Sequence, residues 1–437
     1  MPRPVQTIAW ITRTGPFLER CHARYGDVFS VRIAQEGTWV MLTDPEHVRQ
    51  VFTGDPKVFH AGEANAILRP VLGDNSVLLL DEQPHLAQRK LLLPPFHGER
   101  IQRYVDVMRE VAEREIERWP QGQPLELWPR MQAVTLEVIM RAVFGMQEGA
   151  RLDRLRDALR NTLDWATQPT QMIALALLGP DRVDQLPWFR DRFVDVDQLI
   201  FDEIAARRSD ENLEERDDIM SLLLQARHED DSPMSDQELR DELMTLLVAG
   251  HETTATALAW GIERLVRHPD KLERLREEAD AGGDEYVDAI AKETLRLRPV
   301  IPIVVRRLTE PVEIGGYTIP EGVKVAPCIY LMHRHASVYD PDPTVFRPER
   351  FLEKPAGTYT WIPFGGGIRR CIGASFAVVE MKTVLSAIAR SVDLRAVQPE
   401  PEHVVRRAIT LTPSRGAQVI ASRRVPARPR EEQAVAA

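Results

Sequence analysis

Cysteine is scarce in this chain of 437 residues, which has three, at positions 21, 328 and 371. A small, odd number of cysteines excludes a framework of disulfides. The N-terminal segment also has no apolar core preceding a cleavage site of the kind found in signal peptides. We therefore expect a cytoplasmic protein in a reducing environment.

Long uninterrupted apolar runs are also missing. The longest nearly apolar stretch, residues 243–262, carries His251 and Glu252 at its centre, and such groups are costly inside a bilayer. We interpret the stretch as a buried core helix and expect no membrane span.

Internal repeats, long low-complexity tracts and flexible linkers are absent as well. We therefore expect residues 1–421 to form a single domain, although the length would allow more. From Ser422 onward the chain holds arginine, proline, glutamate and alanine without a period. This composition predicts a disordered tail over residues 422–437.

Excess positive charge is lacking too, because the formal net charge is -10. This argues against nucleic acid or an anionic membrane as the main partner, although local basic patches stay open. We expect no nucleic-acid partner and a monomer.

The residues that are present predict a mainly α protein with small β-sheets. Alternating patterns indicate one hairpin over residues 27–42 and a second over residues 312–319. Helical periodicity indicates amphipathic helices over residues 101–119 and 131–144, and further helices between residues 152 and 207. The charge-dense run Ser209 to Asp218 is interpreted as a solvated connection. After about Arg390 the pattern changes to short strands.

Cys371 lies between a glycine-rich segment and an apolar helix, within the sequence FGGGIRRCIG from Phe364 to Gly373. Free amides at a helix start and in the glycine segment predict a lowered pKa for its thiol. A stabilised thiolate is either a metal ligand or a nucleophile, and a buried structural cysteine is the alternative.

The spacing of the cysteine segment decides between these readings. The residues Phe364, Gly367, Arg369, Cys371 and Gly373 fit the pattern F-x-x-G-x-R-x-C-x-G in every place. The segment resembles the proximal loop of the cytochrome P-450 haem-thiolate monooxygenases, of the soluble bacterial type. The resemblance implies that Cys371 is the axial iron ligand of haem b and that Phe364 shields its sulfur. It also implies that Gly365 and Gly373 let the backbone approach the ring.

Basic residues elsewhere fit the same resemblance. His85 and Arg89 lie four residues apart and share a helical face, which would otherwise be an ordinary surface pair. In bacterial members of the family such a pair binds the haem propionates. The resemblance extends this role to Arg306 and Arg369, and it leaves His333 as an open candidate.

Residues 235–265 predict the longest helix, which a capping box opens at Ser235 and Glu238. Its middle turn, Ala249 to Thr254, reads AGHETT. A threonine hydroxyl there can bond back to the carbonyl of Gly250 or Ala249, which leaves an oxygen-sized notch. A kinked helix with a solvated Glu252 is the alternative.

This turn resembles the distal motif A-G-x-[DE]-T-T of the family. The resemblance implies that Ala249 and Gly250 lie against haem, and that Glu252 and Thr253 deliver protons to the dioxygen being reduced. It therefore places haem between the long central helix and the helix that follows Cys371.

Glu293 and Arg296 match a further family motif, E-x-x-R, which pairs with an arginine of the segment 346–351. A surface helix pair of small value is the alternative. The implied role is structural.

The reaction that the resemblance implies is hydroxylation or epoxidation with dioxygen and two electrons from external NAD(P)H. We find no flavin or nicotinamide domain, so we expect a ferredoxin and a ferredoxin reductase as partners. The alternatives are a peroxide-driven haem hydroxylase and a haem protein that only binds a gas. The intact pair Glu252 and Thr253 argues against both.

The candidate pocket residues are mostly apolar and uncharged, which favours a small lipid-like or terpenoid substrate. They are Thr245, Val248, Ala249, Val300, Ile303 and Val304.

Overall fold

The protein is mainly helical in this computed structural model, which describes residues 1–96, 98–145 and 149–424. The α-helices in these ranges are α1 Arg3–Thr12, α2 Thr14–Tyr25, α3 Pro45–Thr53, α4 Arg69–Leu72, α5 Glu82–Leu92, α6 Glu99–Glu117, α7 Leu127–Phe144, α8 Ala150–Ala166, α9 Pro169–Leu178, α10 Pro180–Val183, α11 Pro187–Arg190, α12 Val194–Arg208, α13 Ile219–Gln225, α14 Asp236–Leu265, α15 Pro269–Ala281, α16 Glu285–Leu297, α17 Ile329–Met332, α18 Arg350–Glu353 and α19 Ala374–Ser391. The strands in these ranges are β1 Val28–Ile33, β2 Gly37–Leu42, β3 Phe59–His60, β4 Pro124–Glu126, β5 Arg306–Leu308, β6 Val312–Ile314, β7 Tyr317–Ile319, β8 Lys324–Pro327, β9 Val392–Ala396, β10 Val404–Arg407, β11 Thr410–Pro413 and β12 Gln418–Arg423.

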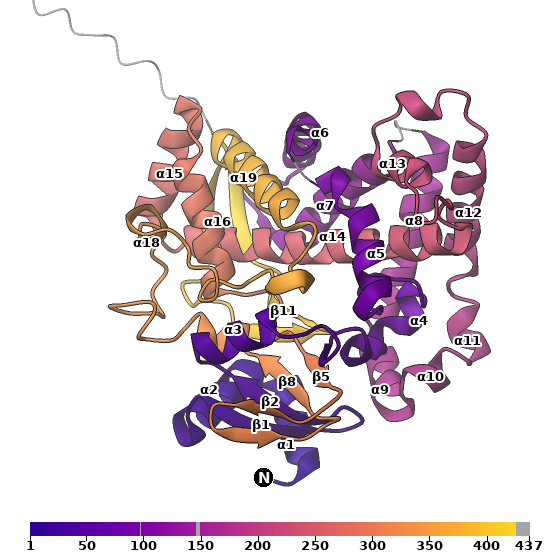
Figure 1. The fold of residues 1–437 in the computed structure, drawn as a ribbon. Coiled ribbons are helices and arrows are strands. Elements are labelled where there is room, and N and C mark those ends of the chain that lie inside the picture. Colours follow the sequence, from indigo (N-terminus) through magenta and orange to yellow (C-terminus); the bar gives the residue numbers. More distant parts are fainter. Residues whose placement is uncertain (97, 146–148, 425–437) are drawn as a thin grey trace, which may run out of the picture.

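Helix α14 crosses the middle of the molecule (Figure 1), and several other helices pack on it. The Ser235 hydroxyl accepts from the Glu238 amide, and the Glu238 carboxylate accepts from the Ser235 amide, so the predicted capping box is present. Helices α7, α16 and α19 pack along α14. The predicted buried core helix is confirmed, because nearly all of its second half is buried. Within the described ranges, no helix has both the length and the apolar character needed to cross a membrane.

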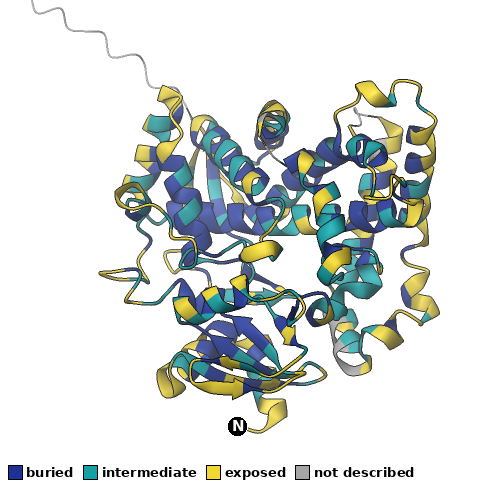
Figure 2. Ribbon diagram, in the orientation of Figure 1, coloured by how far each residue is buried: buried dark blue, intermediate teal, exposed yellow. Residues whose placement is uncertain are grey.

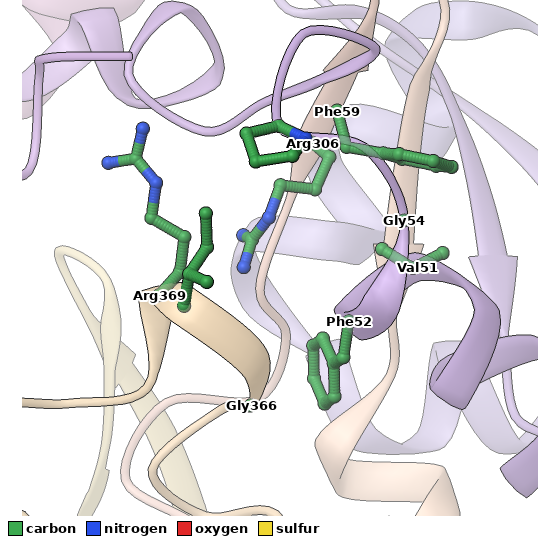
Figure 3. A pocket seen from close by; sticks show the side chains of 9 residues that line it. Val51, Phe52, Gly54, Phe59, Arg306, Gly366 and Arg369 are labelled. Atoms are coloured by element: carbon green, nitrogen blue, oxygen red, sulfur yellow. The ribbon is translucent and has the colours of Figure 1, made fainter. Parts of the chain in front are cut away.

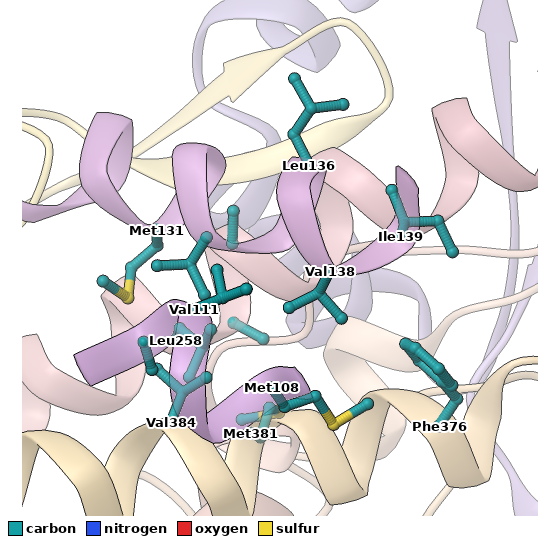
Figure 4. Close-up of a cluster of buried hydrophobic side chains, with 14 of the residues drawn as sticks. Met108, Val111, Met131, Leu136, Val138, Ile139, Leu258, Phe376, Met381 and Val384 are labelled. Carbon is teal, nitrogen blue, oxygen red and sulfur yellow. The ribbon is translucent and has the colours of Figure 1, made fainter. Parts of the chain in front are cut away.

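A large apolar core joins α6, α7, α14 and α19. Met108 of α6, Val138 of α7, Leu258 of α14 and Val384 of α19 converge in it (Figure 4), and each is fully buried. Burying a side chain of this kind contributes roughly 1.5–3 kcal/mol. The core therefore fixes α19, and with it the segment that carries Cys371, against α14.

A five-stranded sheet lies at the N-terminal end of the molecule (Figure 1), with strand order β1-β2-β8-β5-β3. The predicted hairpin of β1 and β2 is confirmed, and β8 pairs with β2 in parallel. The inner strands are largely buried (Figure 2). Strand β5 begins with Arg306, so the sheet holds that residue in place.

The hairpin of β10 and β11 forms hydrogen bonds with α14 and with the segment before β5. The Leu411 amide donates to the Val300 carbonyl (2.8 Å), and the Trp260 indole of α14 donates to the Leu411 carbonyl (2.8 Å). The hairpin thus connects residues near the C-terminus to α14 and to the segment before β5.

The structure differs from two of the sequence predictions. Strand β12 runs to Arg423, so Ser422 belongs to a strand because it pairs with β9; residues 425–437 of the predicted tail lie outside the described residues. The connection Ser209 to Asp218 is not solvated throughout. Asp218 is buried, caps α13, and its carboxylate pairs with Arg207 (2.6 Å).

Candidate active site

A cavity of about 1200 Å³ lies between the middle of α14 and the segment before α19. The residues proposed from the sequence that line it are His85, Arg89, Ala249, Gly250, Thr253, Arg306, Phe364, Gly365, Arg369, Cys371 and Gly373. Glu252 is not part of its wall. The fold therefore brings together segments that are up to about 290 positions apart in the chain, as the pair Val77 and Arg369 illustrates.

Cys371 faces this cavity two residues before Gly373, which is the N-cap residue of α19. Its own amide donates to the Phe364 carbonyl (2.9 Å), so that amide does not point at the sulfur. Burial raises the pKa of the Cys371 thiol, although the Gly373 amide and the charges of Arg89 and Arg370 lower it. The predicted lowering of this pKa is therefore wrong for the free thiol, because desolvation outweighs the helix start. A metal cation bound to the sulfur would reverse that balance.

The glycine segment before Cys371 passes very close to α3. Gly367 has φ +63°, and a Cβ there would overlap the carbonyl oxygen of Phe52. A Cβ at Gly366 would overlap the Phe52 ring. Only glycine fits both the dihedral angle and the space at Gly367, so these residues let the loop pack directly against α3.

Four basic side chains converge at one end of the cavity. Arg306 of β5 and Arg369 of the cysteine loop lie near each other (Figure 3). Arg369 pairs with Asp81 (2.5 Å), whereas Arg306 donates to the carbonyl of its neighbour Val305 (2.8 Å). A separate pocket of about 20 Å³ beside these two arginines has room for about one water molecule.

His85 and Arg89 of α5 complete this basic cluster. His85 is buried, and its Nδ1 has no hydrogen-bond partner among the residues that the structure describes. Arg89 donates to the Arg370 carbonyl (2.7 Å). Burial and the neighbouring arginines lower the pKa of His85 to about 3. Burial likewise lowers the pKa of Arg306 to about 10.

The basic cluster has more positive than negative charge. The Asp81 carboxylate accepts from the amides of Ala61, Gly62 and Glu63 as well as from Arg369. Both of its oxygens therefore already have hydrogen-bond partners. Buried cations without counter-charges are costly unless a ligand supplies them. Together with the soft sulfur of Cys371, the cluster fits a metal-bearing ligand with two carboxylates, which is what haem presents.

The α14 wall of the cavity carries Thr253. Its hydroxyl donates to the Ala249 carbonyl (2.6 Å), which is one of the two carbonyls that the sequence predicted. One turn earlier, Gly250 faces Ile139 of α7, and a Cβ at Gly250 would meet that side chain at 3.1 Å. The small residue thus permits close packing of α7 while Thr253 faces the cavity.

Glu252 points elsewhere. Its Oε1 accepts from the Thr410 hydroxyl of β11 (2.9 Å). Burial raises the pKa of Glu252, while the Thr410 hydrogen bond and Arg407 lower it. The structure therefore separates the acid from the alcohol: Thr253 faces the cavity and Glu252 lies behind its wall.

Sequence reasoning missed several polar groups around the cavity. Glu380 of α19 is buried and bonds to Thr254, and burial raises its pKa to about 8. Asp164, Arg406 and Arg407 line the cavity from α8 and β10. No motif marks these residues, because only long-range contacts bring them to the cavity.

Glu293 and Arg296 form a buried brace behind the cavity. Both are fully buried, with Nε to Oε2 at 2.6 Å, and Arg350 adds a second contact to Glu293 at 3.2 Å. The predicted pairing with an arginine of segment 346–351 is thus present. His333 is not among the residues that line the cavity; its Nε2 accepts from the Ile362 amide (2.9 Å), so it supports the brace instead of the basic cluster.

Comparison with known proteins places the chain in one family. The family profile described as Cytochrome P450 matches residues 5–420. The chain is 44% identical to cytochrome P450 135B1 of Mycobacterium tuberculosis over 426 residues, which covers 95% of this chain and 89% of that protein. It is 38% identical to cytochrome P450 138 of Mycobacterium bovis, with 97% and 95% covered.

Solved structures agree in fold. The haem domain of cytochrome P450DA superposes with a TM-score of 0.80 at 26% identity, covering 94% of this chain and 93% of that chain. The retinoic acid-bound cyanobacterial CYP120A1 gives 0.81 at 23% identity, with 96% of each chain covered. The mainly helical fold with small sheets is therefore the P450 fold, and the chain belongs to the cytochrome P450 family of haem-dependent monooxygenases.

Proposed function

We propose that the chain holds haem b through Cys371 and hydroxylates or epoxidises a small apolar substrate. In the balanced reaction the substrate, dioxygen, NAD(P)H and one proton yield the oxygenated product, water and NAD(P)+. We propose that the electrons arrive from NAD(P)H through a ferredoxin reductase and a ferredoxin. When bound, haem supplies the redox chemistry that activates dioxygen.

The observation that carries this proposal is the pairing of Cys371 with the basic cluster in one cavity. His85, Arg89, Arg306 and Arg369 would hold the two propionates, and Cys371 would supply the axial sulfur. Phe364 and Gly365 would cover the sulfur, and Ala249 and Gly250 would border the opposite face. Charge-assisted hydrogen bonds to propionates contribute roughly 1.5–3 kcal/mol each.

The protein's residues also have proposed roles in the reaction. Thr253 faces the cavity, and its hydroxyl would turn from the Ala249 carbonyl to donate a hydrogen bond where oxygen is reduced. Glu252 would exchange protons with that site through Thr410 and water, because it lies behind the wall and has a raised pKa. Two protons must reach the departing oxygen, and a general acid acts only within hydrogen-bond reach or through one water.

The apolar part of the cavity wall supports an apolar substrate. The segment Val300 to Val305 lines the cavity, as do Leu246 and Ala257 of α14. Apolar surface of this kind favours a ligand of low polarity, such as a lipid or terpenoid. We propose this as the substrate class.

Carbon monoxide spectra test the sulfur ligand. The reduced protein with carbon monoxide should show the strongly red-shifted Soret band of thiolate haem, and Cys371→His should abolish that shift. Cys21→Ser and Cys328→Ser are matched controls at buried cysteines and should keep it. A Cys371→Ser protein that retained the band would overturn the assignment.

Turnover tests the reaction. Product should form from apolar compounds only when NAD(P)H, ferredoxin reductase, ferredoxin and dioxygen are all present. Equal product from hydrogen peroxide without the ferredoxin would instead support a peroxide-driven hydroxylase. Reversible gas binding without any product would support a gas-binding protein.

A further inference from the structure

A second basic site lies on the wall of the cavity, apart from the basic cluster at Cys371. Arg406 of β10 lines the cavity beside Trp10 of α1, with its guanidinium carbon 4.5 Å from the centre of the indole ring. Trp10 in turn packs edge-on against Trp39 of β2, with ring centroids 5.4 Å apart. Two buried aromatic rings and a cation therefore form one corner of the cavity.

Arg406 is the cation of this corner that lacks a counter-charge. Its Nε donates to the Ala408 carbonyl (2.8 Å), and its Nη1 is buried. Among the residues that the structure describes, this Nη1 has no hydrogen-bond partner and Arg406 makes no ion pair. Burial lowers the pKa of Arg406 to about 10 although the charge of Glu36 raises it, so the guanidinium stays charged at neutral pH.

The acids near Arg406 are engaged with other cations. Glu36, which also lines the cavity, pairs with Lys324. Asp164 lies 3.5 Å from Arg407. Arg407 also donates to the Thr167 hydroxyl (3.1 Å). Among the described residues, Arg406 is thus left without an ion pair on its part of the cavity wall.

The β10–β11 hairpin places Arg406 near the start of the segment 300–305. Arg406 pairs with Leu411 across the β10–β11 hairpin, and the Leu411 amide bonds to the Val300 carbonyl. Neighbouring strands lie about 5 Å apart. The backbone of Arg406 is therefore about 5 Å from β11, the strand that bonds to Val300. A ligand lying along that segment, in the cavity that Cys371 also lines, would have one end near Arg406.

We infer that the substrate is an apolar molecule with a carboxylate at one end, which Arg406 binds. A planar guanidinium recognises a carboxylate through parallel hydrogen bonds, while the chain of the ligand lies on Trp10 and along Val300 to Val305. The inference rests on the proposed function and narrows its substrate class from apolar compounds to apolar acids.

Binding to the holoenzyme tests the inference without turnover. Lauric acid, dodecanol and dodecyltrimethylammonium are titrated by calorimetry into tag-free haem-loaded protein at neutral pH. Lauric acid should bind about ten-fold or more tightly than dodecanol, since a hydrogen bond to a charged group supplies that factor. Dodecyltrimethylammonium has no lone pair that could bind iron, and it should bind most weakly because its charge repels the guanidinium.

Variants of Arg406 test whether this side chain causes the preference for the acid over the alcohol. Arg406→Met should abolish the preference for the acid and leave dodecanol binding unchanged. Arg406→Lys should keep part of the preference, because the charge remains but the planar donor pair is lost. Arg395→Met removes an exposed arginine of β9 and should leave all three ligands as they were.

Three results would overturn the inference: equal binding of acid and alcohol to the unmutated protein, an equal loss of both ligands in Arg406→Met, or the same loss in Arg395→Met. If Arg406→Met does not load haem, the comparison of ligands on the unmutated protein and the lysine variant decides. A failure of the proposed function can be told apart from a failure of this inference. Arg406-dependent binding of an acid that is never oxidised would contradict the proposed function alone, whereas equal binding and oxidation of dodecanol would contradict only this inference.

Discussion

Thr253 and Glu252 are neighbours in sequence with different surroundings. About 100° of helical rotation separates consecutive side chains of an α-helix. Thr253 therefore faces the cavity, while Glu252 reaches the Thr410 hydroxyl of β11. This division predicts different phenotypes for the two residues.

Loss of the Thr253 hydroxyl should uncouple the reaction. In Thr253→Ala, haem content, substrate binding and most NAD(P)H consumption should persist, yet product per NAD(P)H should fall several-fold and hydrogen peroxide should rise. Thr253→Ser, which keeps the hydroxyl, is the matched control and should stay coupled. Product and hydrogen peroxide per NAD(P)H are measured with one ferredoxin and one substrate.

Glu252→Gln should instead slow turnover and enlarge the solvent isotope effect, because the amide no longer exchanges the proton. If Thr253→Ala remained as well coupled as the parent protein, the proposed role of its hydroxyl would have to be abandoned, even with Cys371 confirmed as the iron ligand.

At the scale of elements, α16 is held by the brace at Glu293. The Glu293 carboxylate binds the guanidinium of Arg296, the amide of Arg347 and the guanidinium of Arg350. Arg296 also donates to the carbonyls of His333 (2.7 Å) and Pro343 (2.6 Å). One carboxylate thus joins α16 to α18 and to the connection before it.

Glu293→Gln should destabilise the protein by about 3–5 kcal/mol, because the change leaves two arginines buried without a counter-charge. Denaturant unfolding of the haem-loaded protein measures the effect. Glu285→Gln, an exposed position at the start of the same helix, should change stability by less than about 0.5 kcal/mol. Equal stability of both variants would show that the brace contributes nothing.

At the scale of the whole molecule, the cavity concentrates positive charge between the sheet and the helices. The Arg306 guanidinium donates to its neighbouring carbonyl, so its removal costs little protein–protein bonding. Its effect should therefore appear as haem retention.

Arg306→Met should release haem to apomyoglobin about ten-fold faster or more, since a sheltered charge-assisted bond is lost. The adjacent Arg307→Met is the matched control, because Arg307 lies at the surface and pairs with Glu63. Its haem transfer should follow the parent rate. Unchanged retention in Arg306→Met would remove Arg306 from the propionate site.

The outer face of the cysteine segment is where electron delivery should occur. Arg370 and Lys90 are exposed there, and the ammonium group of Lys90 lies 3.5 Å from the Glu229 carboxylate. Reversing both to glutamate should slow reduction by an acidic ferredoxin several-fold while leaving substrate binding alone, and added salt should slow the parent. Arg13→Glu, on the α1–α2 connection, should have no effect. A rate insensitive to salt and to charge reversal would place docking elsewhere.

Features encoded within a few consecutive residues could be predicted from the sequence. The capping box at Ser235, the back-bonded Thr253 and the two hairpins each depend on local spacing and backbone sterics. The Cys371 motif depends on backbone sterics too, because the positive φ at Gly367 favours glycine. The family and the convergence of the proposed haem-binding residues on one cavity followed from these local patterns.

The tertiary structure decided what depends on burial and on distant contacts. Desolvation raises the pKa of Cys371 where the helix start alone predicted a decrease. Glu252 turns to Thr410, 158 positions away, and Arg406 reaches the cavity only because β10 packs beside α1. A charge costs free energy according to the dielectric and the partners around it, and these are set by packing between segments that no local pattern of residues connects.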